Sequence, residues 1–371
     1  MDKANILIIG GGIGGLTAAI ALRQQGFGVE LIEREPEWNV HGIGIIQQSS
    51  VVREMAKLGL LDRYLNAGFG FDFIEIYLAN GQRAARLPSA KLADGYPANV
   101  GVGRRALHEV LSGSAIEAGA RIRLGTTASA IDDDNLGMTV TFSDGSQGRY
   151  DAAVGADGIY STTRKMLFPE AAEPEFVGQG GWRYNFTRSP DLDCIRSYAG
   201  PIGIGLVPIA HDSMYLFTTT PEPDNPHFPR RGIAAVMRDR LKQAPAAIQQ
   251  LLTQLNDDEA VVYKPFEIIL LTGAWHRGRT VLLGDAIHAT TPHLAQGAGM
   301  AIEDGVVLAE ELAAAATVEE AFVAYRDRRF ERCKYIVEAS RAMCDSQLGK
   351  RPPIDPTVAV REMFEVTSQP I

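Results

Sequence analysis

The sequence has few cysteines, no basic stretch and no long apolar run. Cys194, Cys333 and Cys344 are odd in number and widely separated, so neither a disulfide framework nor a C-x-x-C site is expected, and a cytoplasmic location fits. The net charge of −9 argues against nucleic acid as a partner. No apolar run reaches the ~18 residues of a transmembrane helix, so no stable membrane association is expected. The seven histidines show no metal-ligand spacing, so no metal site is predicted.

What the sequence does contain is a glycine-rich turn between two short apolar strands. The strand 6–9 runs into the motif Gly10-x-Gly12-x-x-Gly15, which opens a helix, and the next strand ends at Glu33. Gly10 permits the tight turn, Gly12 lets a pyrophosphate approach the backbone, and Gly15 lets the helix pack close on the strand. The helix N-terminus attracts phosphate, and a carboxylate about 20 residues on can hold a ribose hydroxyl. This arrangement predicts a dinucleotide site.

Two later strands end in turns that combine aspartate with glycine. A buried strand over 150–155 leads to Asp157-Gly158, and another over 280–283 leads to Gly284-Asp285. Open α/β sheets bind their ligands at the carboxyl ends of strands, which favours both turns as ligand sites. Asp157 can equally be a local cap of the helix that follows it, and the residues alone leave both roles open.

Two helices are expected towards the end of the chain. A Gly-x-Gly helix start at 297–299 leaves bare N–H groups that suit a ligand. The stretch Thr317-Val318-Glu319-Glu320 is a capping box, which predicts a last helix of roughly 30 residues. The tail from Arg351 to Ile371 shows no clear pattern.

The middle of the chain is expected to form a separate sheet. Residues 71–78 roughly alternate polar with apolar side chains, Asn80-Gly81 predicts a hairpin, and residues 175–264 are rich in strand-forming stretches. We therefore predict an α/β protein with an α+β substrate region. A Rossmann-like domain with C-terminal helices would consist of 1–70, 98–172 and 266–371, and an inserted, mostly antiparallel sheet domain of 71–97 and 173–265.

Together the three motifs resemble the flavoprotein monooxygenases of the para-hydroxybenzoate hydroxylase type, in particular the hydroxylases of salicylate, 6-hydroxynicotinate and urate. The resemblance covers about residues 6–332 and rests on the first motif, on Gly155-Ala156-Asp157-Gly158-x-x-Ser161-x-x-Arg164, and on Gly284-Asp285-Ala286-x-His288 with Pro292 and Gln296-Gly297. It implies bound FAD, NADPH or NADH as a transient reductant, and O2. The implied reaction hydroxylates an electron-rich aromatic or N-heteroaromatic compound through a flavin C4a-hydroperoxide.

The resemblance also implies roles for individual cofactor residues. Glu33 would bind the adenosine ribose, Arg104 the pyrophosphate region and Asp285 the ribityl chain. Asp157 and Arg164 would belong to the motif linked with both FAD and NAD(P)H. The expected cofactor residues are Gly10, Gly12, Ile13, Gly14, Gly15, Glu33, Arg34, Gly44, Ile45, Arg104, Asp157, Arg164, Gly284, Asp285, Pro292, Gln296, Gly297, Ala298, Gly299 and Met300.

The substrate pocket is expected between the flavin and the inserted sheet. The candidate catalytic residues are Tyr215, His293, Arg183 and Gln47, with Tyr184, Tyr198 and His211 as further candidates. Arg183 could pair with a substrate carboxylate or be a surface charge, and Tyr215 could relay the substrate proton or only fill the core. His293 follows Pro292 and should lie near the flavin ring. His288 belongs to the third motif, where packing and chemistry are both open.

Three other functions remain open at this point. The first is a related flavin monooxygenase that performs epoxidation or Baeyer–Villiger oxidation on a non-aromatic or polyketide substrate. The second is a plain NAD-dependent dehydrogenase, against which the turns at Asp157 and Asp285 argue. The third is a flavin-binding protein without turnover. The main prediction is an enzyme with a small aromatic substrate, present as a monomer or a homodimer.

Overall fold

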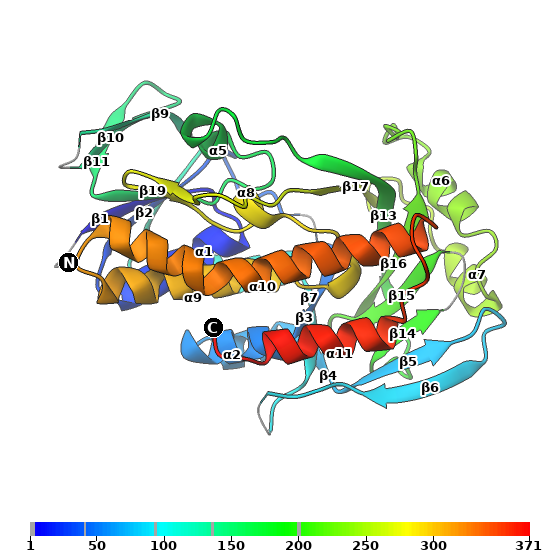
Figure 1. Cartoon of the computed structure of the whole chain (residues 1–371). Helices are drawn as coiled ribbons and strands as arrows, with labels where there is room; N and C mark the ends of the chain where they lie inside the picture. Colours follow the sequence, from blue (N-terminus) through cyan, green and yellow to red (C-terminus); the bar gives the residue numbers. More distant parts are fainter. Residues whose placement is uncertain (1–3, 41, 93–94, 135–136, 199–201) are drawn as a thin grey trace.

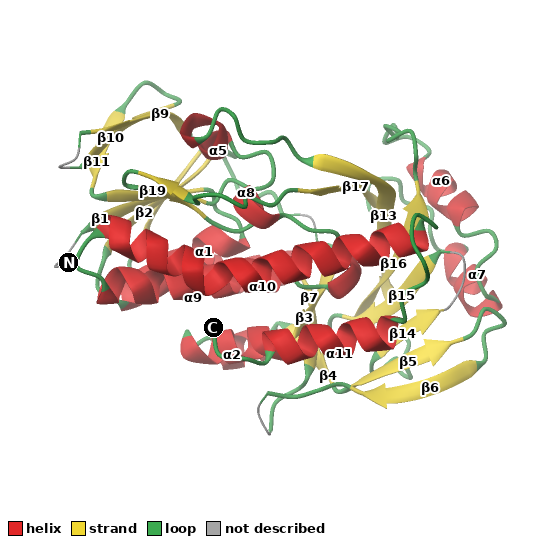
Figure 2. Cartoon of the chain, in the orientation of Figure 1, coloured by secondary structure: helices red, strands yellow, loops and turns green. Residues whose placement is uncertain are grey.

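Two large sheets, two small three-stranded sheets and a set of helices make up the described part of the chain. The computed structural model describes residues 4–40, 42–92, 95–134, 137–198 and 202–371. One half is built on a mostly parallel sheet and the other on a mostly antiparallel one (Figure 2). The helix α10 (Val318–Gln347) contacts both α9 (Gly297–Ala314) and β13 (Glu175–Thr187), so it spans the two halves (Figure 1). The predicted fold class, α/β with an inserted sheet and C-terminal helices, is confirmed.

The nucleotide-binding half contains a six-stranded sheet in the order β18-β19-β12-β1-β2-β8. Its central strands pair in parallel, and only the edge strand β18 is antiparallel to its neighbour. Both faces of β1 are buried, which explains its unbroken apolar run. The strands are β1 (Asn5–Ile9), β2 (Gly28–Glu33), β8 (Arg121–Leu124), β12 (Ala152–Gly155), β18 (His276–Arg277) and β19 (Thr280–Leu282).

Helices cover one face of this sheet and a small sheet covers the other. Helix α1 (Ile13–Gln24) packs on β1 and β2, and α4 (Arg104–Glu117) and α9 pack on α1. Gly305 allows the close approach of α9, because a Cβ there would lie 2.7 Å from the backbone nitrogen of Ala18. The small sheet has the order β11-β10-β9, with β9 (Ala128–Asp133), β10 (Met138–Phe142) and β11 (Gln147–Tyr150).

A second small sheet lies between the halves, with the order β3-β7-β4. Asn99–Gly103 forms the central strand β7, and α4 begins only at Arg104. Strand pairing on both edges of β7 stabilises this short strand. The other strands are β3 (Gly44–Gln48) and β4 (Gly68–Phe71).

The inserted half is a seven-stranded sheet in the order β17-β13-β16-β15-β14-β5-β6. All neighbours are antiparallel except β14 and β5, and the predicted Asn80-Gly81 turn joins β5 to β6. Helices α6 (Ile233–Arg240) and α7 (Ala246–Leu252) contribute to the apolar core on one face. The remaining strands are β5 (Phe73–Tyr77), β6 (Arg83–Pro88), β14 (Ile195–Tyr198), β15 (Gly203–Pro208), β16 (Ser213–Pro221) and β17 (Val262–Ile268). The division into two domains stays a prediction.

The C-terminal region holds one confirmed and one missed element. Thr317 and Glu320 form the expected capping box, and α10 is 30 residues long. The tail is not patternless, because α11 (Pro356–Thr367) begins at the cap Asp355 and packs on α10. The other short elements are α2 (Ser49–Lys57), α3 (Leu61–Asn66), α5 (Thr162–Leu167), α8 (Asp285–His288) and the 3-10 turn η1 (Pro292–Leu294).

Two expectations from composition concern cysteines and membranes. All three cysteines are free and buried. Of the helices in the described ranges, none combines the length and the apolar character that a membrane crossing needs. The cytoplasmic location stays a prediction.

Candidate active site

The three sequence motifs meet at one edge of the parallel sheet. Strands β1, β12 and β19 are neighbours, so their carboxyl ends lie side by side. The backbone N–H of Ala156 donates to Ile9 O at 2.8 Å, and that of Leu283 donates to Gly155 O at 2.9 Å. This edge is where open parallel sheets bind their ligands, and all three turns reach it.

The glycine turn has the geometry that its motif predicts. Gly10 adopts φ 114, and a Cβ there would lie 2.4 Å from Ala156 O. A Cβ on Gly15 would lie 2.0 Å from Gly10 O, so only glycine lets α1 start this close to β1. A Cβ on Gly12 would meet no atom within 4 Å, which leaves open space at the helix N-terminus. That open space beside Ile13 and Gly14 fits a pyrophosphate.

The end of β2 places Glu33 beside this turn. Its carboxylate accepts from the backbone N–H of Gly11 at 2.8 Å and from that of Glu35 at 3.1 Å. Arg34 points away, with a side chain that is 77% exposed and paired with Glu35. The position of Glu33 suits the predicted ribose contact, whereas nothing in the described contacts of Arg34 supports a cofactor role.

The second motif is tied into the protein itself. Asp157 accepts from the Thr163 N–H at 2.9 Å and from the hydroxyls of Ser161 and Thr162, so it stabilises the first turn of α5 beside the N-cap Ser161. This is the local role that the sequence left open. Arg164 is buried and donates to Ala286 O at 3.0 Å, which joins the second motif to the third. Any contact of Asp157 or Arg164 with a ligand stays a prediction.

The third motif presents Asp285 at the start of α8, after Gly284 with its φ of 66. Asp285 is accessible to solvent, but the protein atoms packed around its carboxyl group partly desolvate it and raise its pKa. The charges of His288 and Arg104 act in the opposite direction. Arg104 is exposed at the start of α4, near enough to lower the pKa of Arg183. Arg104 therefore lies where the cofactor edge of the sheet approaches the inserted half.

The segment before α9 forms another wall. Ala295 adopts φ 53, a left-handed conformation that is energetically unfavourable for residues other than glycine. Such strained residues are concentrated at functional sites. The side chain of Gln296 contacts that of Gln48, whose Nε2 also donates to Leu294 O at 3.2 Å. The first turn of α9 then follows with Gly297, Ala298 and Gly299, and the positive end of the helix faces this region.

Two further residues of this region differ in their surroundings. Met300 lies in the apolar core and its N–H is bonded to Gln296, so its cofactor role stays a prediction. Gln47 on β3 is buried, and neither end of its amide has a hydrogen-bond partner among the described residues. A buried amide without a partner is costly unless a ligand or water completes it, and a binding role for Gln47, Gly44 and Ile45 stays a prediction.

The inserted sheet turns Arg183 and Tyr215 towards β3. The Tyr215 ring lies against Gly44, where a Cβ would come within 2.3 Å of it, and burial raises the tyrosine pKa to about 12. Arg183 is half-buried and, among the described residues, has no hydrogen-bond or ion-pair partner. Burial, together with Arg104, lowers the pKa of Arg183 to about 10. Arg183 is thus partly shielded from water, and its role towards a substrate stays a prediction.

His293 lies near this face but is held by protein groups. Its Nδ1 is 2.9 Å from the Thr291 hydroxyl and its Nε2 is 3.1 Å from Gln347 Oε1. Burial lowers its pKa to about 4, so the ring is neutral and donates through Nε2 to the amide oxygen. This environment favours a positioning role, and catalysis by His293 stays a prediction.

The other candidates lie elsewhere. Tyr184 and Tyr198 belong to the apolar core on the opposite face of the sheet, beneath α6 and α7, so their proposed place in the pocket is wrong. The alternation of side chains in a strand places them there. His211 is an exposed loop residue between β15 and β16.

Two aromatic residues of the near face escaped the sequence prediction. The Phe217 ring lies over Gly205, where a Cβ would come within 2.2 Å of it, and the Phe266 ring lies over Gly181 in the same way. Phe217 follows Tyr215 by two residues on one strand, a signal that could have identified it. The glycines supply flat backbone on which the rings rest.

Comparison with known proteins identifies the family. The FAD binding domain family matches residues 3–340. The chain belongs to this family. It is 32% identical to Bacillus subtilis YetM, provisionally described as a FAD-dependent monooxygenase, over 94% of this chain and 95% of that protein. It is 31% identical to the 2-heptyl-3-hydroxy-4(1H)-quinolone synthase of Pseudomonas aeruginosa, over 90% and 87%. Klebsiella pneumoniae HpxO, solved with FAD and uric acid, matches with TM-score 0.86 and 25% identity over 99% and 93%.

The family confirms the predicted enzyme class and cofactor. The protein is a FAD-dependent monooxygenase, and the alternative of a plain NAD-dependent dehydrogenase is wrong. The residues present fit FAD, because open space at Gly12, the unpartnered amide of Gln47 and the N-terminus of α9 offer donors for its polar groups. When bound, FAD supplies the redox and oxygen chemistry with NAD(P)H and O2. The chain positions and orients the substrate against the cofactor and excludes water from the site.

Proposed function

We propose that this monooxygenase hydroxylates a small electron-rich aromatic or N-heteroaromatic compound that binds as an anion. The observation that carries the proposal is Arg183, a half-buried guanidinium without a partner among the described residues. A cation held away from water favours an anionic ligand, because the ligand replaces the lost hydration. The uric acid bound by HpxO and the quinolone in the name of the Pseudomonas relative are ring compounds of this kind.

The proposed pocket holds the ring between aromatic walls and polar ends. Phe217 and Phe266 would pack against the ring, since aromatic pairs favour offset or edge contacts. Arg183 would bind the anionic oxygen or carboxylate. Where that oxygen is a ring hydroxyl, the cation lowers its pKa, and the ionised ring is richer in electrons.

Tyr215, Gln47 and His293 would complete the orientation of the substrate. With a pKa of about 12, Tyr215 keeps its proton at neutral pH and would donate a hydrogen bond to a substrate oxygen. The unpartnered amide of Gln47 would serve either the substrate or the flavin edge. His293, neutral and bonded to Gln347, would hold the loop before α9 in place.

The proposal is tested with a panel of paired aromatic compounds, each offered with and without an ionisable hydroxyl or carboxyl group. We expect the ionisable member of a pair to stimulate NAD(P)H oxidation and to gain one oxygen atom on its ring, as read by mass spectrometry. Neutral, non-aromatic substrates that are epoxidised or expanded by oxygen insertion would overturn the proposal in favour of the alternative chemistry. The same assay with NADH and NADPH identifies the reductant, and the expected monomer or homodimer is measured by light scattering.

A further inference from the structure

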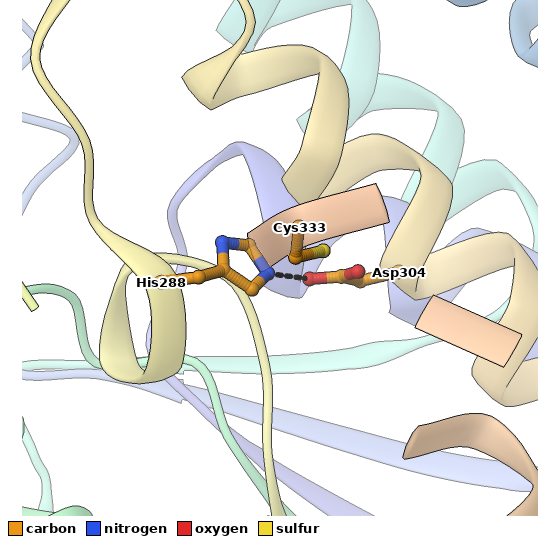
Figure 3. Close-up of side chains that lie close together, drawn as sticks. All are labelled: His288, Asp304 and Cys333. Atoms are coloured by element: carbon orange, nitrogen blue, oxygen red, sulfur yellow. Dashed lines mark hydrogen bonds and ion pairs between the residues drawn. The ribbon is translucent and has the colours of Figure 1, made fainter. Parts of the chain in front are cut away.

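Three buried side chains from separate elements meet directly beneath the Gly284-Asp285 turn. They are His288 on α8, Asp304 on α9 and Cys333 on α10, and Figure 3 shows them pointing towards one another. The Nε2 of His288 lies 2.7 Å from Oδ2 of Asp304, and both side chains are fully buried. Burial lowers the pKa of His288, but the neighbouring Cys333 and Asp304 raise it well above its usual value. The cluster thus contains a buried charge pair rather than neutral packing.

Arg329 argues against a metal ion in this cluster. Its Nε donates to Oδ1 of Asp304 at 2.8 Å, and its Nη2 lies 3.6 Å from Sγ of Cys333. A guanidinium therefore already neutralises the groups that a metal would need as ligands. The three side chains therefore belong, with Arg329, to a buried network of ion pairs and hydrogen bonds.

Asp304 holds both ends of the α8 turn with one oxygen. Its Oδ2 accepts from the Gly284 N–H at 3.0 Å as well as from His288. Asp285 lies between these two bonded residues. The direction in which Asp285 reaches the cofactor edge is therefore set by a carboxylate on another helix.

The same network holds the first turns of α9. Arg329 donates to Met300 O at 3.3 Å and to the Glu303 carboxylate at 2.6 Å, as well as to Asp304. Removing one member of such a network leaves an uncompensated buried charge, which is strongly destabilising, so the network opposes separation of the helices it joins. The turn with Asp285 and the N-terminus of α9 are thereby fixed relative to each other.

We propose that Asp304 is a positioning residue for FAD, whose carboxylate fixes the Asp285 turn against the N-terminal end of α9 so that both meet the flavin at once. The proposal depends only on FAD as the cofactor and not on the substrate proposed above. His288 and Arg329 act with it as the two cations that hold the carboxylate in place.

The test compares Asp304→Asn with the control Glu311→Gln, a carboxylate-to-amide change in an ion pair on the same helix, farther from the turn. We expect Asp304→Asn to raise the Kd for FAD by about tenfold or more, the ~1.4 kcal/mol of one weakened site contact, and to change the visible circular dichroism of the bound flavin. The control should change neither. Unfolding of the apoprotein is followed in parallel, so that loss of the fold is seen separately.

A second pair keeps the test decisive where Asp304→Asn does not fold. His288→Gln retains an N–H donor for Asp304 and should keep near-normal FAD affinity, whereas His288→Ala should weaken it. The proposal fails if the variants lower only the unfolding temperature and leave the FAD Kd and the flavin dichroism unchanged. It also fails if the purified protein carries one metal ion per chain bound through Cys333.

Discussion

The cofactor edge and the substrate face of this monooxygenase are built in opposite ways. At the edge of the parallel sheet, backbone groups form the site, because Gly10, Gly12 and Gly15 create a turn that leaves N–H groups free. On the inserted sheet, side chains form the site. Arg183 on β13 and Tyr215 on β16 are 32 positions apart in the sequence, and the pairing of the two strands places them on one face. A site made of one continuous turn can be predicted from the sequence, whereas a site assembled from paired strands cannot.

The two faces of the inserted sheet also differ, because one packs into an apolar core and the other faces the cofactor side. Trp182 and Tyr184 on β13 point into the apolar core under α6 and α7, while Arg183 between them points to the cofactor side. Shifting β13 by one residue would exchange the two sets. The pairing of Arg183 with Phe217 and of Asn185 with Tyr215 therefore determines which residues can meet a substrate.

The largest expected effect separates two glycines of the same turn. Gly15→Ala forces a Cβ to within 2.0 Å of Gly10 O and should abolish stable folding or FAD retention altogether. Gly12→Ala meets no protein atom within 4 Å, so the apoprotein should unfold at a nearly unchanged temperature while FAD binds about tenfold or more weakly. Thermal unfolding and FAD titration measure both. Equal losses of apoprotein stability in the two variants would contradict the open cradle at Gly12.

Arg183→Met sharpens the comparison from the substrate side. We expect KM for the anionic substrate to rise by about 100-fold, within the ~2–5 kcal/mol that a buried, hydrogen-bonded charge pair contributes. FAD content should stay normal, because the two sites are built by different elements. Steady-state kinetics and the flavin spectrum test this, with the exposed Arg231→Met as the control. A parallel loss of FAD in Arg183→Met would place the arginine at the cofactor instead.

Tyr215→Phe should have a smaller effect that concerns coupling. Loss of one neutral hydrogen bond contributes ~0.5–1.5 kcal/mol, so hydroxylated product per NAD(P)H should fall about two- to tenfold, with more peroxide released. The tyrosine pKa of about 12 means that its ionisation does not shape the pH profile near neutrality. Product and peroxide are quantified together, and unchanged coupling would remove Tyr215 from the site.

The last prediction concerns stability rather than catalysis, through the pH dependence that His293 contributes. Its pKa is about 4 in the folded protein and ~6.5 when unfolded. The unfolded chain therefore binds the proton more readily, and the stability contributed by the neutral ring is lost as the pH falls from about 6.5 towards 4. The unfolding temperature of His293→Gln should therefore fall less than that of the parent protein as the pH is lowered over this interval. Identical pH dependence of the two proteins would show that the ring is not held neutral.

Much of the cofactor side was predictable because its signals are local. The turns at Gly10, Asp157 and Gly284 follow apolar strands, and parallel pairing brings those strand ends together. The capping box of α10 is a four-residue pattern and proved correct. By contrast, the helix α11 and the strand β7 were missed, because tertiary packing and pairing stabilise them more than their own sequence does.

By itself the sequence determined a dinucleotide site, the order of motifs and the fold class, because conformational demands on glycine and the spacing of apolar residues act over short stretches. The family resemblance of the three motifs then implied FAD. Only the tertiary structure decided that Arg183 is half-buried without a partner among the described residues, that Tyr184 faces the far core, and that Asp304 accepts a hydrogen bond from the turn that holds Asp285. Desolvation and charge pairing depend on which distant groups share a volume, and that volume exists only once the strands and helices have packed.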